Sequence, residues 1–317
     1  MNVEKKVLKF QKNYVLKRFS FYPISHVVKC TICGGNNIRF FERSRKYNFD
    51  VYMCSDCKIG FRYPMPSKEE IANLYSEGYY NGSSSYSYVD ERKVKGSSFV
   101  WRERIRKVVE VYEYYNGRKP ENIIDVGCSF GGLLLEASRF GLKPYGVEIS
   151  RYSGGYARKR GIEVFEGHLD EVDLPKGFFD IVTMVEVIEH LDNPVFSIRK
   201  VFESLRDGGV FLVQTANILG LQSRFWGGYY HYYLPGHLHY FSNVGLRKLL
   251  NRVGFRKVLE FYPVEFGVLP KLIKVYLNTK GFERYLRLAK TAIYHTLGKV
   301  KIENFTLMSS MVMIGVK

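Results

Sequence analysis

The run of residues 121–141, ENIIDVGCSFGGLLLEASRFG, constrains the fold more than any other part of this sequence. Residues 123–126 predict a short buried strand, residues 127–131 a turn punctuated by glycines, and residues 132–140 a helix that ends before Gly141. A strand, a glycine turn and a helix in this order form a corner where a nucleotide can approach the backbone closely. The run therefore predicts an α/β fold with a ligand at the carboxyl end of this strand.

Two acidic residues stand at the ends of predicted strands. Asp125 precedes the first glycine in the pattern D-x-G-x-S-x-G, which differs from the dinucleotide pattern GxGxxG. An acid at this position suits the ammonium group of an amino-acid-bearing ligand better than a pyrophosphate. Glu148 ends a second strand, KPYGVEIS, where a carboxylate can accept hydrogen bonds from both ribose hydroxyls.

Strands and helices continue to alternate after this corner. A third strand, IEVFEG, leads to His168 and Leu169, and a fourth, FDIVTMV, leads to EVIEHL at 186–191. A fifth strand, GGVFLVQTA, follows the helix VFSIRKVFESL. A helix over 244–253, a strand near 255–262 and a final strand, FTLMSSMVMIGVK, complete the chain. This alternation predicts a doubly wound, mostly parallel sheet.

Four of the five cysteines form two CxxC pairs, Cys30 with Cys33 and Cys54 with Cys57. Each pair places two thiolates on a tight turn, and two such turns on a β-hairpin complete a tetrahedral site for Zn²⁺. Four thiolates leave no open position for chemistry, so the ion is expected to be structural. Residues 1–66 are therefore expected to form an N-terminal segment and a small zinc ribbon.

Composition limits the class of protein. No stretch approaches 18 uninterrupted apolar residues, and the basic N-terminus is not followed by an apolar signal segment, so a cytoplasmic location is expected. The net charge of +17 is compatible with nucleic acid, an anionic membrane surface, acidic small molecules or simply a lysine-rich proteome. Charge alone does not choose among them.

The runs IIDVGCSFGG, GVEIS, FDIVTMVEVIEHLDNP and LRDGGVFLVQTAN together resemble, in order and spacing, the signature of class I S-adenosylmethionine-dependent methyltransferases. The resemblance implies a Rossmann-like seven-stranded sheet with its last strand antiparallel, and methyl transfer from the sulfonium of S-adenosylmethionine to an acceptor. The cysteine leader and PGHLHYFS also resemble a subgroup of surface-polysaccharide and sugar-modification enzymes. Sugar C-methyltransferases with zinc are similar too, but they are longer, which favours O-methylation here.

The resemblance assigns a set of residues to the cofactor: Asp125, Gly127, Ser129, Gly131, Glu148, His168 and Leu169. It implies that Asp125 and the glycines contact the amino-acid and ribose parts, and that Glu148 binds the ribose. Ser129 replaces the middle glycine of the usual turn, and His168 and Leu169 match positions that flank the adenine.

An alcohol acceptor must lose its proton as it receives a methyl group, so a nearby histidine is the natural general base. His190 and His237 are the two candidates, and Glu186 and Glu189 are expected to orient a histidine or the acceptor. In the competing interpretation each histidine only ties down a loop, and Glu189 is a solvated acid in a first helical turn. The aromatic run over 225–241 is either a platform for sugar rings or a loop that packs on itself.

The predicted organisation has three parts: residues 1–66, a helical linker with a loop over 67–118, and a methyltransferase domain over 119–317 with a basic helical insertion at 264–303. The insertion has an apolar stripe that is expected to pack on the domain. Alternatively, it lies on an anionic membrane at the inner membrane face.

The preferred function is O-methylation of a sugar hydroxyl on a nucleotide sugar or a surface glycan. The alternatives are an RNA methyltransferase, motivated by the charge, the zinc ribbon and the aromatic run, and a C-methyltransferase acting on a nucleotide-linked keto sugar. A third is an inactive, cofactor-binding partner in glycan assembly. Nucleic acid is the less favoured partner because the basic residues are dispersed, and the sequence does not fix the oligomeric state.

Overall fold

The computed structural model of the protein describes residues 29–74, 79, 90–296, 301–302, 305–306 and 309–317. A seven-stranded sheet with the order β10-β13-β8-β7-β4-β5-β6 forms its centre. Its strands are β4 (Asn122–Val126), β5 (Lys143–Glu148), β6 (Glu163–Glu166), β7 (Phe179–Val185), β8 (Leu205–Ala216), β10 (Lys257–Phe261) and β13 (Ser310–Val316). Strands β4 to β8 pair in parallel, and β13 runs antiparallel to both of its neighbours. The predicted Rossmann-like α/β fold with its last strand antiparallel is confirmed.

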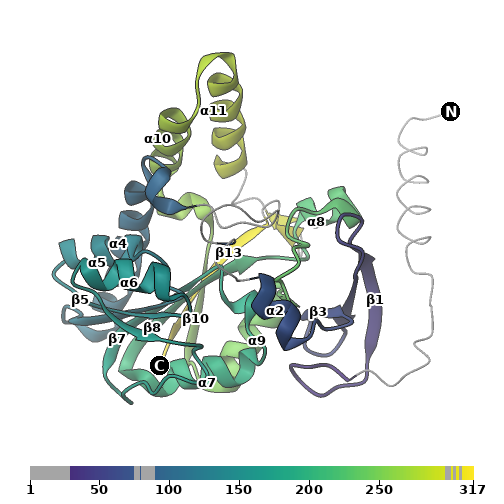
Figure 1. Cartoon of the computed structure of the whole chain (residues 1–317), viewed down its shortest axis with the longest axis horizontal. Coiled ribbons are helices and arrows are strands. Elements are labelled where there is room, and N and C mark those ends of the chain that lie inside the picture. The colour runs from purple at the N-terminus through teal and green to yellow at the C-terminus, as the bar shows by residue number, and fades with distance from the viewer. Residues whose placement is uncertain (1–28, 75–78, 80–89, 297–300, 303–304, 307–308) are drawn as a thin grey trace.

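Helices cover both faces of this sheet (Figure 1). One face carries α4 (Ser97–Asn116), α5 (Gly132–Arg139) and α6 (Arg151–Lys159), and the other carries α7 (Pro194–Ser204) and α9 (Asn243–Val253). Neighbouring residues of a strand point to opposite faces, so Ile123 and Ile124 belong to different core clusters. Burial on both faces explains why these strands read as continuous apolar runs.

A second, four-stranded antiparallel sheet is built from β1 (Ile38–Arg43), β2 (Asp50–Cys54), β3 (Gly60–Tyr63) and β9 (His239–Tyr240). The sequence predicted a β-hairpin for the cysteine-bearing segment, but β9 lies in PGHLHYFS, for which no strand was predicted. This strand joins the cysteine-bearing segment to the region after β8. Further bonds hold the same contact: the backbone N of Arg62 donates to Leu238 O at 2.9 Å, and Ser242 Oγ donates to Lys58 O at 2.6 Å.

Short elements connect these sheets. Helix α2 (Lys68–Leu74) begins with a capping box, because Glu70 N donates to Ser67 Oγ and Ser67 N donates to the Glu70 carboxylate. The predicted loop over 78–88 lies outside the described residues except for Tyr79. The remaining short elements are η1 (Glu91–Lys93), η2 (Ile188–His190), α8 (Leu221–Trp226), η3 (Gly227–Tyr229) and η4 (Pro263–Phe266).

The region between β10 and β13 differs from the prediction in two ways. Helices α10 (Val268–Asn278) and α11 (Gly281–Thr296) form a hairpin that projects from the body of the molecule, so the apolar stripe of α11 does not pack on the domain (Figure 1). The final strand is also shorter than predicted. Residues 305–306 form β12 and pair with β11 (Lys301–Ile302), so β13 begins at Ser310.

The carboxylate of Asp180 connects β7 to the N-terminal end of β4 and is fully buried. It accepts hydrogen bonds from Tyr112 Oη at 2.6 Å, from the backbone N of Glu121 and Asn122 at 2.9 and 3.0 Å, and from the Arg118 guanidinium at 3.0 Å. Burial alone would raise the pKa of Asp180, but these hydrogen bonds hold the pKa below its ordinary value. The ionised form is therefore the one that stabilises the fold.

We expect Asp180→Asn to lower the free energy of unfolding by about 3 kcal/mol, because an amide cannot accept these bonds with both of its terminal atoms. Urea unfolding at pH 7 measures the loss. The folded pKa lies below the unfolded one, so the contribution of Asp180 is complete above about pH 4 and falls away as the pH drops through the folded pKa. Asp173→Asn, an exposed change on the preceding loop, is the control, and equal stability of the two variants would contradict the assignment.

Candidate functional site

The glycine turn between β4 and α5 has the backbone geometry expected of a close-approach corner. Gly127, Ser129 and Gly131 all have positive φ, at 75°, 49° and 80°. A Cβ on Gly127 would lie 2.5 Å from a methyl group of Val187, and a Cβ on Gly131 would lie 2.3 Å from a methyl group of Ile162. Glycine is therefore required at both positions by conformation and by space.

The two predicted acids lie at this corner, and both are buried. Glu148 accepts hydrogen bonds from the backbone N of Ser129 at 2.8 Å and of Ser150 at 2.9 Å, so it links the glycine turn to the end of β5. Asp125 accepts a hydrogen bond from Thr183 Oγ1 at 2.6 Å. Burial, together with the nearby Glu91 and Glu148 carboxylates, raises the pKa of Asp125 to about 7. The corner thus gathers three acidic side chains, an arrangement that favours a cationic group.

The other predicted cofactor residues follow β6. Leu169 is buried in the core cluster that includes β4 and β7, whereas the side chain of His168 is exposed. Both residues lie in the loop that follows Glu166, and Glu166 pairs with Glu148 across strands β6 and β5. They therefore lie near Glu148, and their assignment to the adenine stays a prediction.

A segment that sequence reasoning missed closes over the same turn. The Glu91 carboxylate accepts a hydrogen bond from the backbone N of Gly132 at 3.1 Å, which places it at the N-terminus of α5. The Arg92 guanidinium lies 3.8 Å from the ring centre of Phe130 and is flanked by Tyr152 and Tyr156. A cation on three aromatic faces and an acid on a helix N-terminus hold this segment to the corner.

A cluster of buried acids and histidines lies at the carboxyl ends of β7 and β8. Glu189 is 1% exposed, so the interpretation of Glu189 as a solvated acid is wrong. One of its oxygens accepts a hydrogen bond from Thr215 Oγ1 at 3.0 Å. The rings of His190 and His237 have centroids 4.6 Å apart. Burial lowers the pKa of His190 to about 4 and holds that of His237 well below its ordinary value, so both rings are neutral at pH 7.

Glu186 has a positive φ of 57° and is held by Gln214, whose Nε2 donates to its Oε1 at 2.7 Å. The same amide accepts two bonds from the buried Arg104 guanidinium, at 2.8 and 3.0 Å. Lys271 of α10 also lies near Glu186, and burial, followed by repulsion from Arg104, lowers its pKa to about 7. No sequence motif marked Arg104, Gln214 or Lys271, because they come from three separate elements.

The aromatic run over 225–241 divides into two sets. Tyr230, Tyr233 and Tyr240 are buried with Phe49 and other side chains of the cysteine-bearing sheet. A second set, on α8 and η3, is exposed and consists of Phe225, Trp226 and Tyr229. The buried set packs as the second interpretation expects, and the role of the exposed set as a platform for sugar rings stays a prediction.

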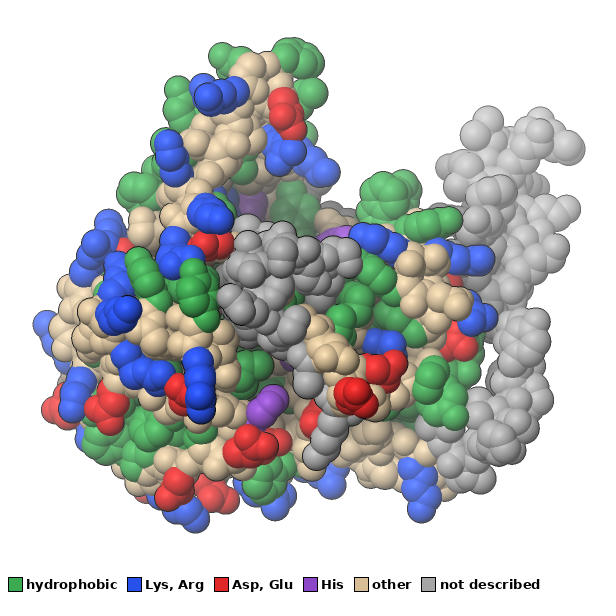
Figure 2. Space-filling model, viewed as in Figure 1, with side chains coloured by type: hydrophobic (Ala, Val, Ile, Leu, Met, Phe, Trp, Pro, Cys, Tyr) green, Lys and Arg blue, Asp and Glu red, His purple; other side chains and the backbone are tan. Residues whose placement is uncertain are grey.

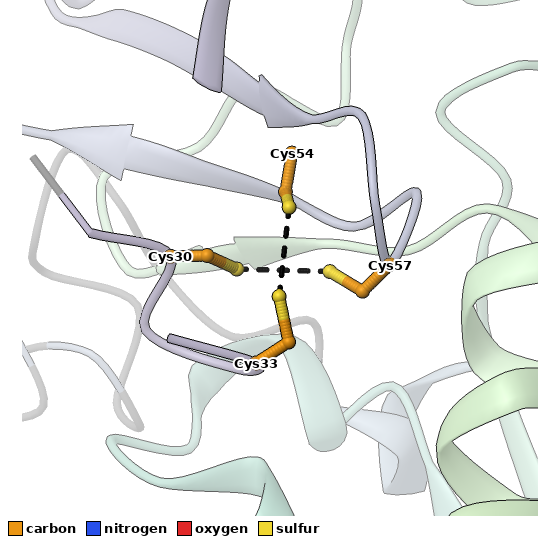
Figure 3. Close-up of side chains that lie close together, drawn as sticks. All are labelled: Cys30, Cys33, Cys54 and Cys57. Carbon is orange, nitrogen blue, oxygen red and sulfur yellow. Dashed lines mark hydrogen bonds between the residues drawn. The ribbon is translucent and has the colours of Figure 1, made fainter. Parts of the chain in front are cut away.

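The four paired cysteines converge on one point (Figure 3). The Sγ atoms of Cys30 and Cys57 are 3.6 Å apart, as are those of Cys33 and Cys54, and all four lie within 4.8 Å of one another. Tetrahedral zinc with bonds of about 2.3 Å would separate its sulfurs by about 3.8 Å. The two knuckles also share a backbone pattern, because Gly34 N donates to Cys30 O and Lys58 N donates to Cys54 O. The cluster has the spacing of a tetrathiolate metal site.

Comparison with known proteins gives a consistent result. A family model described as a methyltransferase domain matches residues 100–260. The ajmaline N-methyltransferase of Rauvolfia serpentina is 30% identical over 105 residues, which make up 30% of this chain and 36% of that protein. The ubiquinone biosynthesis O-methyltransferase of Nitrosococcus oceani is 29% identical over 104 residues, or 31% of this chain and 44% of that protein.

Among solved structures, the plantazolicin methyltransferase BamL, in complex with a triazolic desmethylPZN analog and SAH, superposes with a TM-score of 0.50. It is 16% identical, and the match covers 78% of this chain and 97% of that one, which shows a shared fold. The chain spans only 36% to 49% of the length of the first three curated relatives. These relatives include both O- and N-methyltransferases, so they do not fix the atom that is methylated.

Proposed function

This chain belongs to the methyltransferase domain family, and on that premise we propose that it is an S-adenosylmethionine-dependent enzyme that methylates a hydroxyl group of a sugar, carried on a nucleotide or a surface glycan. The observation that carries the proposal is the position of a buried histidine and carboxylate cluster. It lies at the ends of β7 and β8, next to the glycine corner of β4. A donor site and a proton-accepting site thus meet at one edge of the sheet.

The corner fits S-adenosylmethionine by its chemistry. The buried carboxyl group of Asp125 suits the donor's ammonium group, and Gly127 and Gly131 allow the positive φ angles that shape the turn beside it. Glu148, at the end of β5, would bind the ribose hydroxyls. When bound, the donor supplies an electrophilic methyl group on a sulfonium.

The acceptor side supports a hydroxyl substrate. His190 and His237 are neutral at pH 7, so each has a ring nitrogen that can accept a hydrogen bond or a proton from an alcohol. Glu186 is fixed by Gln214 close to this cluster and would orient the acceptor. The exposed rings of Phe225, Trp226 and Tyr229 offer apolar faces of the kind that bind sugar rings.

We also propose that the cysteine cluster binds one structural Zn²⁺. The support is the 3.6 Å spacing of opposite sulfurs and the closed, four-thiolate donor set. Such an ion would have no open position, so its role is to fold the ribbon rather than to bind substrate.

The function is tested by transferring labelled methyl from S-adenosylmethionine into a fractionated extract of a strain that lacks the gene. Asp125→Ala protein serves as the blank. Label in nucleotide-sugar, glycan or lipid-linked glycan fractions supports the proposal and identifies how the sugar is carried. Label confined to RNA contradicts it and favours an RNA methyltransferase.

Peripheral contact with an anionic membrane is proposed for the α10–α11 hairpin. Its exposed apolar side chains include Phe282, Tyr285, Leu286 and Ile293, which are 57% to 77% exposed, and lysine and arginine residues lie among them (Figure 2). Within the described residues, no helix combines the length and the apolarity needed to span a bilayer. An exposed apolar stripe with basic neighbours is typical of a helix that lies in the membrane interface.

We expect the protein to float with vesicles that contain anionic lipid at low salt and to be released at high salt. The double variant Phe282→Ser, Leu286→Ser should reduce the bound fraction by about tenfold or more, since each apolar side chain contributes about 1.5–3 kcal/mol when buried. Tyr114→Ser, which removes a highly exposed ring from α4, is the control. Equal flotation of the double variant and the wild type would contradict the proposed contact.

A further inference from the structure

Three side chains from two distant parts of the chain meet outside the cysteine cluster. Glu189 and His190 belong to η2, directly after β7, and His237 precedes β9. One potential ligand atom from each of the three lies within 4.8 Å of the others. Glu189 and His237 are 1% and 4% exposed, and His190 is partly exposed. The group is therefore buried on one side and accessible on the other.

Backbone carbonyls fix the tautomer of both histidines. The Nδ1 atom of His190 lies 2.8 Å from Gly236 O, and the Nδ1 atom of His237 lies 2.8 Å from Tyr232 O. A carbonyl can only accept, so Nδ1 carries the proton in each ring and Nε2 keeps its lone pair. Histidine ligands of metal ions are commonly held in this way, with the second ring nitrogen donating to a carbonyl.

The carboxylate of Glu189 is only half satisfied. One oxygen accepts the bond from Thr215, whereas Oε1 is buried and receives no hydrogen bond from an amide, hydroxyl or ammonium group among the described residues. The Glu189 side chain instead shares a hydrogen bond with the buried carboxyl group of Glu186. Two buried carboxyl groups in contact are costly to ionise together unless a positively charged partner lies beside them. A cation between Glu189 and the histidines would supply that partner.

We propose that Glu189, His190 and His237 bind a divalent transition-metal cation, which in turn binds the hydroxyl group of the acceptor. Two imidazoles and one carboxylate are a donor set suited to Mn²⁺, Fe²⁺, Co²⁺ or Zn²⁺, and three protein ligands leave coordination positions open. The second part of the inference, the acceptor hydroxyl, rests on the proposed function. The first part, the metal site, does not.

The cation would make the hydroxyl group of the acceptor more acidic. A hydroxyl bound to a divalent cation has a much lower pKa than a free alcohol, so its proton passes to water more readily. In the metal-bound state the histidines hold the cation, and the proton that they would otherwise accept passes to water. The nearby Glu186 is outside this set, because among the described residues the group of ligand atoms within 4.8 Å of one another comprises only Glu189, His190 and His237.

The two metal sites differ in donor type, which allows them to be measured separately. The cysteine cluster offers four thiolates and favours zinc, whereas the nitrogen and oxygen donors of the second site accept manganese. Mn²⁺ added to the full chain with zinc retained at the cysteines therefore reports on the second site. The amplitude of the free Mn²⁺ signal in electron paramagnetic resonance gives the bound fraction without any donor or acceptor present.

We expect one bound Mn²⁺ per chain. Glu189→Gln and His237→Gln should each lower the affinity by at least about 100-fold, since even the outer partners of metal ligands contribute about 10- to 100-fold. His231→Gln, an exposed histidine of the same segment, should leave the affinity unchanged. Circular dichroism establishes that each variant is folded, and the partly exposed His190→Gln serves where a buried variant does not fold.

Pulsed measurements on the wild-type Mn²⁺ complex provide a test that needs no variant. Coupling of the electron spin to imidazole nitrogen supports the site. Lack of that coupling, lack of Mn²⁺ binding by the wild type, or equal binding by folded Glu189→Gln and wild type overturns it. Binding of S-adenosylhomocysteine is measured in parallel by calorimetry. If that ligand binds and Mn²⁺ does not, the metal site is rejected and the proposed methyltransferase function is retained.

Discussion

Replacing Cys54 with serine is expected to release the zinc ion and to unfold the ribbon formed by β1, β2 and β3. The segment is too small to bury a sufficient core by itself, and structural zinc contributes about 10–16 kcal/mol to the folding of comparable peptides. Metal analysis should fall from one zinc per chain to less than about one tenth, because three remaining thiolates bind the ion weakly and admit water. Methyl transfer should fall with it, since β9 and His237 lose their support.

Cys128→Ser is the matched control for this experiment. Cys128 is buried and unbridged, but it lies in the glycine turn and far from the cluster in sequence. That variant should keep its full zinc content. Zinc retained by Cys54→Ser, or lost equally by both variants, would argue against a tetrathiolate site.

Glu148→Ala is expected to weaken binding of S-adenosylhomocysteine by at least about 100-fold, measured by titration calorimetry. Two hydrogen bonds to a carboxylate contribute about 1.5–3 kcal/mol each, and every 1.4 kcal/mol corresponds to about tenfold in affinity. The variant also removes the acceptor for Ser129 N and Ser150 N, so the turn loses its preformed shape. Both effects weaken binding of the methyl donor rather than binding of the methyl acceptor.

Glu166→Gln gives the control for Glu148. Glu166 pairs with Glu148 across strands β6 and β5, is exposed, and forms ion pairs with Arg151 and Arg158. The affinity of Glu166→Gln for S-adenosylhomocysteine should stay within about twofold of wild type, because exposed ion pairs contribute less than about 1 kcal/mol. A Glu148→Ala protein that binds as tightly as the control would remove Glu148 from the donor site.

Local sequence patterns predicted the central sheet well. Strands such as Ile123–Val126 are apolar on both faces, and the turns between strands and helices carry glycine where positive φ is needed, as at Gly127 and Gly131. Strand β9 could not be predicted, because two residues carry no detectable alternation and the partner, β3, lies far away in sequence. The exposure of α11 also escaped prediction, since an amphipathic pattern does not reveal whether its apolar face is covered.

Motif spacing located the residues of the site but not their connections. Asp125 and Glu148 were recognisable because each follows a strand in a known pattern. The link from Arg104 through Gln214 to Glu186 joins α4, β8 and the end of β7, and no spacing encodes such a contact. The two interpretations of Glu189 stayed open for the same reason, because its burial depends on the segment around Leu238, whose backbone N donates to Glu189 O at 2.8 Å.

The pairing of β3 with β9 makes the cysteine cluster and the histidine cluster a linked system. Thr31 Oγ1 lies 3.1 Å from the Nε2 atom of His239, which is two residues after His237. Zinc bound to the cysteines would therefore stabilise the position of β9 in which His237 can bind its ligand. Thermodynamic linkage is reciprocal, and a ligand at the histidine cluster must then raise the affinity of the cysteines for zinc by the same factor. The supply of zinc would thus set the fraction of molecules that can bind the acceptor, and bound acceptor would protect that fraction when zinc is scarce.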